Sequence, residues 1–244
     1  MTTAISGWAR FAAYAYPPNE LGYCGPPDPS VLLAGKSDEI GDHAQGFDGA
    51  WPYLEELATA AGRRDPLDAE VVHAYWIGGR LLGLVDPAAL LSRLRTAMAG
   101  QPCGLLTETT AVAGVLAHHS FHVFVVYPWI RFLGPNSADQ ATPLRILQSC
   151  RIRWGTVESV DDESAVLSSR PLRFDGALRL SEPTQETVRW RGADGTALAA
   201  RPVPGSSVAA HWDWVCGTLD AEDVDALAAA TASTLELVNR LRAR

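Results

Sequence analysis

Lysine is almost absent from this chain, and the sequence contains no cluster of basic residues. Lys36 is the only lysine, and the 244 residues carry a net charge of −8. Proteins that bind nucleic acids neutralise phosphates with clustered lysine and arginine side chains. We therefore expect no nucleic-acid partner.

Long apolar segments are also missing. No apolar run approaches the roughly 20 residues that a helix needs to span a bilayer. Residues 1–8 do not have the basic segment followed by an apolar core that marks a signal peptide. The four cysteines, Cys24, Cys103, Cys150 and Cys216, form no CxxC motif. We expect a soluble cytoplasmic protein with free thiols and no membrane association.

The first 148 residues contain sequence signals for the starts and ends of helices, which predict a helical domain. Asp65-Pro66 and Asp86-Pro87 each combine an N-cap residue with a proline at the first helical position, which predicts two helix starts. Residues 111–133 are the most apolar stretch and predict a buried helix that Pro128 ends or kinks. Periodicity alone leaves strand character open at Val123–Val126.

From residue 149 onward the pattern changes to the period of two that is typical of strands. The predicted strands cover residues 151–160, 165–168, 186–190 and 207–214. Short strands at this spacing predict a small barrel of the OB type. Asp220 predicts the N-cap of a closing amphipathic helix. The predicted fold is α+β, with a helical domain over residues 1–148 and an OB-like β-barrel with a C-terminal helix over residues 149–244.

Two motifs in the second part bear side chains that can bind a metal. Residues 150–155 read Cys-Arg-Ile-Arg-Trp-Gly, and residues 205–211 read Gly-Ser-Ser-Val-Ala-Ala-His. A barrel brings distant strands together, so Cys150 and His211 can approach each other. A thiolate beside an imidazole is a sound site for a soft metal. The alternative is a packed cysteine and a hydrogen-bonded histidine in the core.

The order of these motifs, with strands between them and an acid-rich helix after them, resembles the HypC-type maturation chaperones of nickel–iron hydrogenases. The resemblance implies that Cys150 and His211 transiently bind an iron atom that carries cyanide and carbon monoxide. It also implies a HypD-type iron–sulfur protein and the precursor of the hydrogenase large subunit as partners, and no enzymatic turnover. Cys150 departs from the family pattern because it lies in mid-chain, and Ser206 replaces the usual aspartate.

The helical part offers a competing metal site. His118 and His122 are four residues apart, so on a regular helix they share a face. His119 is rotated by about 100° from His118 and is the weaker candidate. Glu70 and His73 are further candidates. This arrangement predicts a metal- or haem-dependent enzyme as the alternative function, although histidines in an apolar helix are also common as core residues.

The segment Tyr14–Pro26 is rich in proline, glycine and aromatic residues. Such a loop can hold the thiol of Cys24 or the carboxylate of Glu20 in a fixed position, or it can be a structural plug. The first part of the chain as a whole resembles an uncharacterised bacterial helical family.

Trp212 and Trp214 are two residues apart in the last predicted strand. Strand alternation places both on one face, which we expect to cover the helical domain or, alternatively, to bind a ligand. A third hypothesis for the whole chain is a structural or interaction protein that uses neither metal site. The three hypotheses differ in where the polar side chains converge.

Overall fold

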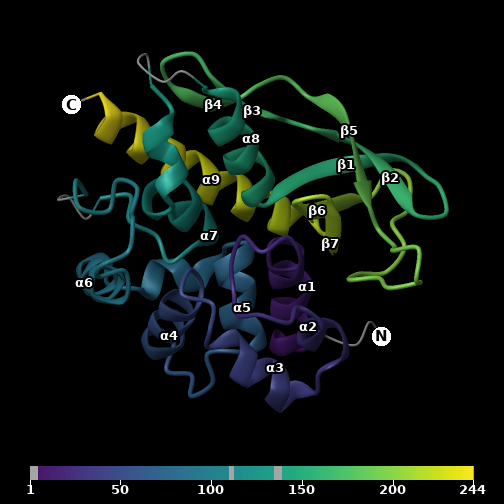
Figure 1. The fold of residues 1–244 in the computed structure, drawn as a ribbon, viewed down its shortest axis with the longest axis horizontal. Coiled ribbons are helices and arrows are strands. Elements are labelled where there is room, and N and C mark those ends of the chain that lie inside the picture. Colours follow the sequence, from purple (N-terminus) through teal and green to yellow (C-terminus); the bar gives the residue numbers. More distant parts are fainter. Residues whose placement is uncertain (1–4, 110–112, 135–138, 244) are drawn as a thin grey trace.

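The computed structural model describes residues 5–109, 113–134 and 139–243. Helices from the first part of the chain lie on one side of the molecule, and strands from the second part lie on the other (Figure 1). The last helix, α9, runs along the boundary and contacts α7, β4 and β7. The molecule is therefore a mixed α+β structure with a C-terminal helix.

Helical segments account for most of the first part. They are α1 Gly7–Glu20, α2 Ser30–Ala34, α3 Ser37–Ala44, α4 Trp51–Ala60, α5 Ala69–Trp76, η1 Arg80–Leu84, α6 Pro87–Ala97, α7 His119–Phe121, η2 His122–Val126, η3 Pro128–Phe132 and α8 Ala141–Cys150, and the second part adds α9 Ala221–Arg242. Asp86 caps α6 as predicted, since its carboxylate accepts from the backbone N–H of Ala88. Asp220 likewise caps α9. The start predicted at Asp65 is wrong by three residues, because Asp68 is the cap of α5.

Five strands form a sheet that closes into a ring, in the order β1-β2-β5-β7-β6, and β6 pairs again with β1. Within the ring, β5 and β7 are parallel and every other pairing is antiparallel. The strand bounds are β1 Arg153–Val160, β2 Ser164–Ser169, β3 Leu172–Phe174, β4 Leu178–Leu180, β5 Thr184–Arg189, β6 Ser207–His211 and β7 Trp214–Leu219. The hairpin β3–β4 is a separate two-stranded sheet that the sequence analysis missed.

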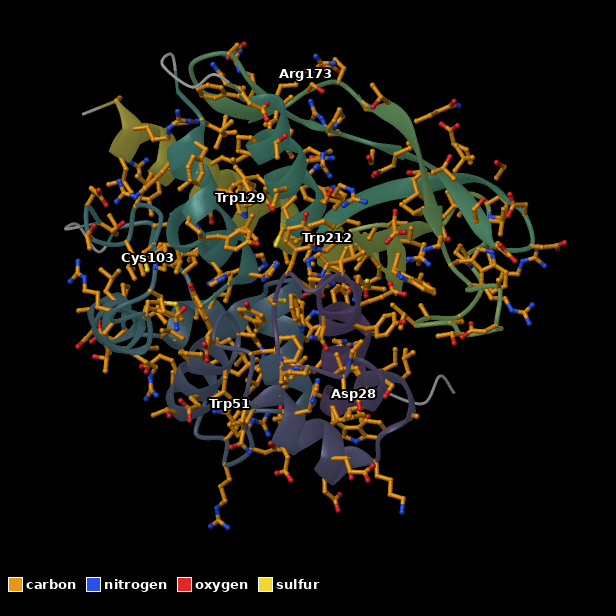
Figure 2. The ribbon with its side chains drawn as sticks, in the orientation of Figure 1. Asp28, Trp51, Cys103, Trp129, Arg173 and Trp212 are labelled. Atoms are coloured by element: carbon orange, nitrogen blue, oxygen red, sulfur yellow. The ribbon has the colours of Figure 1, made fainter. Side chains whose placement is uncertain are left out.

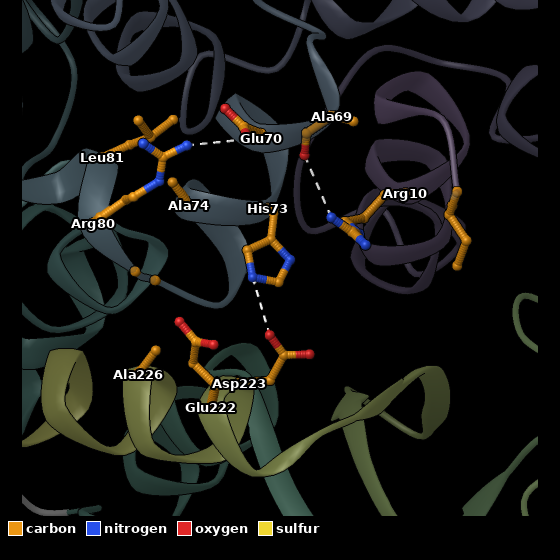
Figure 3. Close-up of a pocket in the computed structure, with 13 residues that line it drawn as sticks. Arg10, Ala69, Glu70, His73, Ala74, Arg80, Leu81, Glu222, Asp223 and Ala226 are labelled. Carbon is orange, nitrogen blue, oxygen red and sulfur yellow. Dashed lines mark hydrogen bonds and ion pairs between the residues drawn. The ribbon is translucent and has the colours of Figure 1, made fainter. Parts of the chain in front are cut away.

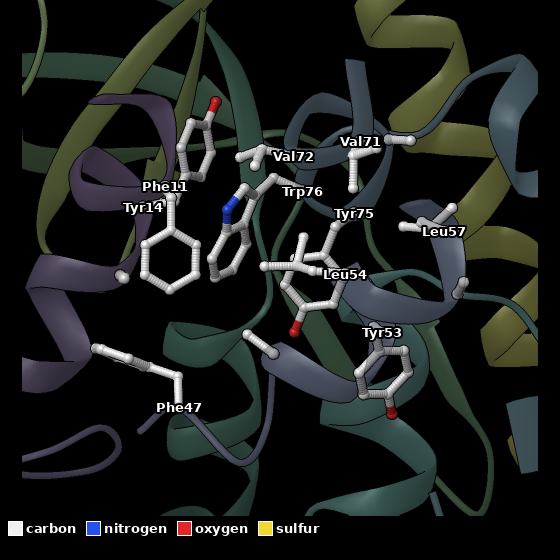
Figure 4. Close-up of a cluster of buried hydrophobic side chains, with 14 of the residues drawn as sticks. Phe11, Tyr14, Phe47, Tyr53, Leu54, Leu57, Val71, Val72, Tyr75 and Trp76 are labelled. Atoms are coloured by element: carbon white, nitrogen blue, oxygen red, sulfur yellow. The ribbon is translucent and has the colours of Figure 1, made fainter. Parts of the chain in front are cut away.

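The main hydrophobic core joins the two parts of the chain. It contains Phe11 and Tyr75 from the helices, and also Trp214 and Leu227 from beyond residue 148. Figure 4 shows the helical side of this core, where the indole of Trp76 lies beside Tyr14 and Tyr75. The division at residue 148 stays a prediction, but the two parts share this buried core.

The predicted single helix over residues 111–133 is wrong. Residues 111 and 112 lie outside the described residues, and the rest contains three short helical segments, of which η2 is a π-helix. Tyr127 has extended backbone angles because the proline that follows it disfavours the helical region. Pro128 then begins η3. This break changes which histidines share a face.

The predicted strand 207–214 is two strands joined by a turn at Trp212 and Asp213. Trp212 has a φ of 52°, in the left-handed region that favours glycine. The two tryptophans therefore do not share a strand face. Trp212 packs against Tyr23, with ring centroids 4.2 Å apart, whereas Trp214 enters the main core. Figure 2 labels Trp212 where the strands meet the helices.

Among the described residues, every helix is too short or too polar to cross a membrane.

Candidate metal site

Three side chains that can bind a metal come together where the helices meet the ring of strands. The ligand atoms of His119, Cys150 and His211 all lie within 4.8 Å of one another, and all three residues are buried. His119 begins α7, Cys150 ends α8 and His211 ends β6. They line a cavity of about 40 Å³.

His211 is held in one tautomer by a backbone carbonyl. Its Nδ1 lies 2.6 Å from the carbonyl oxygen of Tyr14. Because a carbonyl oxygen only accepts, Nδ1 carries the proton and Nε2 has the lone pair. The Nε2 atom is buried and has no hydrogen-bond partner. Burial also lowers the pKa of His211 to about 4, so the ring is neutral near pH 7.

The carbonyl of Tyr14 is available because of the local sequence of α1. In a regular helix it would accept from the backbone N–H of the residue four positions later. That residue is Pro18, which has no N–H. The proline therefore frees the oxygen that orients His211.

His119 takes part in a chain of hydrogen bonds that allows either tautomer. Its Nε2 lies 2.9 Å from the carbonyl oxygen of Cys150, and its Nδ1 lies 3.0 Å from the hydroxyl of Tyr75. That hydroxyl also lies 2.8 Å from the carbonyl oxygen of Gly49. With no ion bound, the Cys150 carbonyl only accepts, so Nε2 of His119 carries the proton. To bind a metal through Nε2, His119 has to give up this hydrogen bond. Tyr75 then donates to Gly49 and accepts from Nδ1 of His119. Burial lowers the pKa of His119 well below 6.5, which disfavours a doubly protonated ring.

Cys150 supplies the thiol of the cluster. Its residue is 8% exposed, and burial raises the pKa of the thiol well above its usual value. A metal ion would therefore replace a thiol proton here. Ligand atoms on a tetrahedral ion with bonds of about 2.0–2.3 Å lie roughly 3.3–3.8 Å apart. The observed limit of 4.8 Å requires a contraction of the cluster by about 1 Å on binding.

The surroundings of the cluster are aromatic and contain no carboxylate among the cavity-lining residues. The positive charge of Arg153 lowers the pKa of His211 further, and Arg153 itself pairs with Glu186 at 2.9 Å. Thiol and imidazole ligands suit Zn²⁺ and late transition metals, whereas Mg²⁺ and Ca²⁺ prefer oxygen ligands.

The structure brings the predicted residues Cys150 and His211 together, but it separates His118 from them. His118 is the N-cap of α7, where its Nδ1 accepts from the backbone N–H of Ser120 at 3.0 Å. His122 lines the cavity but lies outside the three-residue cluster. Its ring packs on Gly49, where an added Cβ would lie 2.7 Å from Nε2.

His119, which the sequence analysis ranked below its neighbours, is the histidine that completes the cluster. The ranking assumed one regular helix, whereas α7 begins at His119 and gives way to a π-helix after three residues. The only sequence signal for His119 was the run of three histidines within five residues.

Cys24 and Glu20 lie close together in sequence but in different surroundings. Cys24 is on the exposed segment between α1 and α2, yet its side chain lines the cavity. Glu20 instead accepts hydrogen bonds from Tyr16, Arg189 and Trp214, at 3.0–3.2 Å. This carboxylate joins the end of α1 to the strands.

His73 and Glu70 lie in a separate surface pocket of about 360 Å³ (Figure 3). His73 Nε2 is 3.1 Å from Asp223, which also belongs to the capping box of α9. Glu70 pairs with Arg63 and Arg80. Neither residue belongs to the buried cluster.

Comparison with known proteins gives a family but no function. A family model described as "Family of unknown function (DUF6390)" matches residues 3–244, so the chain belongs to this family. No curated protein and no solved structure matches the chain.

The family match corrects the resemblance to HypC-type chaperones. One model covers the helices and the strands together, so the second part is not a member of a separate chaperone family. C-x-x-x-x-G and G-x-x-V-x-x-H are short patterns, and a thiol and a histidine at the ends of buried elements can match them by chance. The first part likewise does not belong to a helical family of its own.

Proposed function

We propose that this chain, a member of the DUF6390 family, binds one transition-metal ion through His119, Cys150 and His211. The proposal takes up the metal-binding hypothesis and locates it at the boundary between helices and strands. Without the HypC resemblance, nothing in the described residues singles out an iron–cyanide–carbonyl unit, a HypD-type protein or a hydrogenase precursor.

The observation that carries the proposal is the unpartnered Nε2 atom of His211. This atom is buried, and the hydrogen bond from Nδ1 to Tyr14 leaves Nε2 with a free lone pair. The thiol of Cys150 and the imidazole of His119 lie within 4.8 Å of it. An unsatisfied buried acceptor costs about 1–3 kcal/mol. Metal-binding histidines commonly donate their other N–H to a carbonyl oxygen, as His211 does.

The size of the cavity supports a bare ion over a haem. The cavity offers about 40 Å³ to the centre of a water-sized sphere, against the roughly 10–15 Å³ that one water molecule needs on the same measure, so it has room for an ion or a few water molecules. A metal ion with protein ligands fits such a space. We therefore favour a metal ion over the haem-dependent enzyme, and a water molecule is the competing occupant.

We infer in addition that the ring of strands is OB-like. Its support is the order β1-β2-β5-β7-β6 with a single parallel pairing, between β5 and β7. An OB-fold is a five-stranded Greek-key barrel. In this interpretation β3 and β4 are an insertion that packs on α8 and α9.

The test is direct measurement of metal binding. We expect purified protein, stripped with a chelator, to bind one equivalent of Zn²⁺ or Co²⁺ per chain by equilibrium dialysis with elemental analysis. Binding should raise the melting temperature, because a ligand that binds only the folded state stabilises it. Cys150→Ser and His211→Ala should each abolish stoichiometric binding.

Matched controls come from side chains outside the cluster. Cys103→Ser removes a half-buried thiol, and His73→Asn removes a histidine from the surface pocket. Both variants should bind one equivalent, and circular dichroism should show that all four variants are folded. Wild-type protein that binds no ion, or a folded Cys150→Ser variant that binds as well as wild type, would refute the proposal.

A further inference from the structure

A second thiol lines the same cavity as the three clustered ligands. Cys24 belongs to the exposed segment between α1 and α2, but it is one of the cavity-lining residues, and burial raises the pKa of its thiol. Its thiol is close enough to Cys150 for a charge on one to affect the other. It lies outside the set whose ligand atoms are all within 4.8 Å, so it must move closer to share an ion with them.

The charge balance of the cavity favours a second anionic ligand. A divalent ion bound by the Cys150 thiolate and two neutral imidazoles keeps one net positive charge. Burying an unpaired charge is unfavourable. The lining residues include no aspartate or glutamate. Among the described lining residues, Cys24 is the remaining side chain whose anion is a common zinc ligand, since thiolate sulfur binds Zn²⁺.

The segment that carries Cys24 is anchored on both sides. The amide nitrogen of Asn19 donates to the carbonyl oxygens of Cys24 and Pro26, each at 2.8 Å. On the other side, the ring of Tyr23 packs against Trp212, the residue that follows His211. These contacts hold Cys24 at the edge of the cavity.

We propose that Cys24 is the fourth ligand, and that it completes a closed Cys₂His₂ site for Zn²⁺ with His119, Cys150 and His211. Four protein ligands in tetrahedral geometry are typical of structural zinc sites. The inference rests on the proposed metal binding and adds the coordination and the class of ion. His122, which also lines the cavity and has an unpartnered Nδ1, is the competing fourth ligand. It is neutral and would leave the positive charge in place.

The test compares Cys24→Ser with His122→Ala and Cys103→Ser. We expect Cys24→Ser to lower Zn²⁺ affinity by more than about 100-fold, since even loss of an outer-shell partner costs 10- to 100-fold. Cobalt in the wild-type protein should show tetrahedral bands with thiolate charge transfer, and Cys24→Ser should lose about half of the charge-transfer intensity. The other two variants should keep both the affinity and the spectrum.

A second readout identifies the thiol directly. In the stripped protein Cys24 should react with iodoacetamide, and one equivalent of Zn²⁺ should protect it, as peptide mass spectrometry would show. Unchanged affinity in Cys24→Ser, or greater loss in His122→Ala, would overturn the inference while metal binding stands. Absence of Zn²⁺ binding in the wild-type protein would instead refute the proposed function itself.

Discussion

The Nδ1 atom of His211 lies 2.6 Å from the carbonyl oxygen of Tyr14, although 197 residues separate the two in sequence. The bond exists because Pro18 cannot donate to that carbonyl within α1. A proline in a helix thus leaves an acceptor that sets the tautomer of a histidine on a distant strand. The lone pair of Nε2 then faces the cluster.

Pro18→Ala should weaken metal binding without removing a ligand. The new backbone N–H can bond to the Tyr14 carbonyl within the helix and draw it away from His211. The loss of one orienting hydrogen bond, worth about 1 kcal/mol, should lower Zn²⁺ affinity about fivefold. Isothermal titration calorimetry measures the change. Pro17→Ala is the matched control, because its new N–H faces the carbonyl of Ala13, which does not orient His211. An equal effect of both variants on Zn²⁺ affinity would contradict the argument.

Tyr75→Phe should reduce metal affinity through His119. The variant removes the hydroxyl that can accept from Nδ1 of His119, and with it the support for the tautomer whose Nε2 is free to bind an ion. Such orienting partners are worth about 10- to 100-fold in affinity. The stoichiometry should stay at one ion per chain. Tyr53→Phe is the control, since the Tyr53 hydroxyl is buried without a partner and its ring lies 5.5 Å from Tyr75. Equal affinities for the two variants would show that the hydroxyl of Tyr75 does not orient the ligand.

The metal-free protein should lose stability as the pH falls below neutrality. Burial lowers the pKa of His118, His122 and His211 to about 4, below the unfolded value of about 6.5. The unfolded state therefore binds more protons between these values. The stabilising contribution is complete above pH 6.5 and declines toward pH 4, by about 1.4 kcal/mol per pH unit for each histidine. Urea unfolding at pH 7, 6 and 5 in the presence of chelator measures the free energy of unfolding.

A variant of one histidine isolates its share of this acid sensitivity. His118→Asn keeps a side-chain acceptor for the backbone N–H of Ser120, because asparagine is also a good N-cap. It removes one titrating group. The slope of the free energy of unfolding against pH should therefore be smaller by the amount that corresponds to one proton, about 1.4 kcal/mol per pH unit. An unchanged slope between pH 7 and 5 would mean that His118 does not stay neutral in the folded protein.

Glu20→Ala should destabilise the fold and spare the metal site. The carboxylate accepts from the indole of Trp214 at 3.0 Å and from Arg189 at 3.2 Å, which tie α1 to the strands. A hydrogen bond to a charged group contributes up to about 1.5–3 kcal/mol. We therefore expect the free energy of unfolding to fall by about 1–3 kcal/mol. Glu236→Ala, on an exposed face of α9, should change it by less than about 0.5 kcal/mol. Loss of Zn²⁺ binding in a folded Glu20→Ala variant would contradict the structural role.

Local sequence patterns identified several elements and two of the three side chains in the buried cluster. Asp86 and Asp220 cap helices as their sequence contexts predicted. The period-two pattern located the strands after residue 149, while the β3–β4 hairpin and the turn at Trp212 escaped it. That turn was hidden because a tryptophan occupies a backbone conformation that usually marks glycine.

The sequence by itself determined the chemistry that is available: four cysteines, three histidines between residues 118 and 122, His211, and a proline pair that removes two N–H donors from α1. The tertiary structure decided which of these groups meet. His119 joins Cys150 and His211, rather than His118 or His122, because α7 packs on α9 and brings Nε2 of His119 to the carbonyl oxygen of Cys150 at the end of α8. Cys24 faces the same cavity because α1 packs across the end of β6. The contacts of His119 with Cys150 and of His211 with Tyr14 join residues that are 31 and 197 positions apart in the sequence. They depend on how whole helices and strands pack, which a local sequence pattern does not predict.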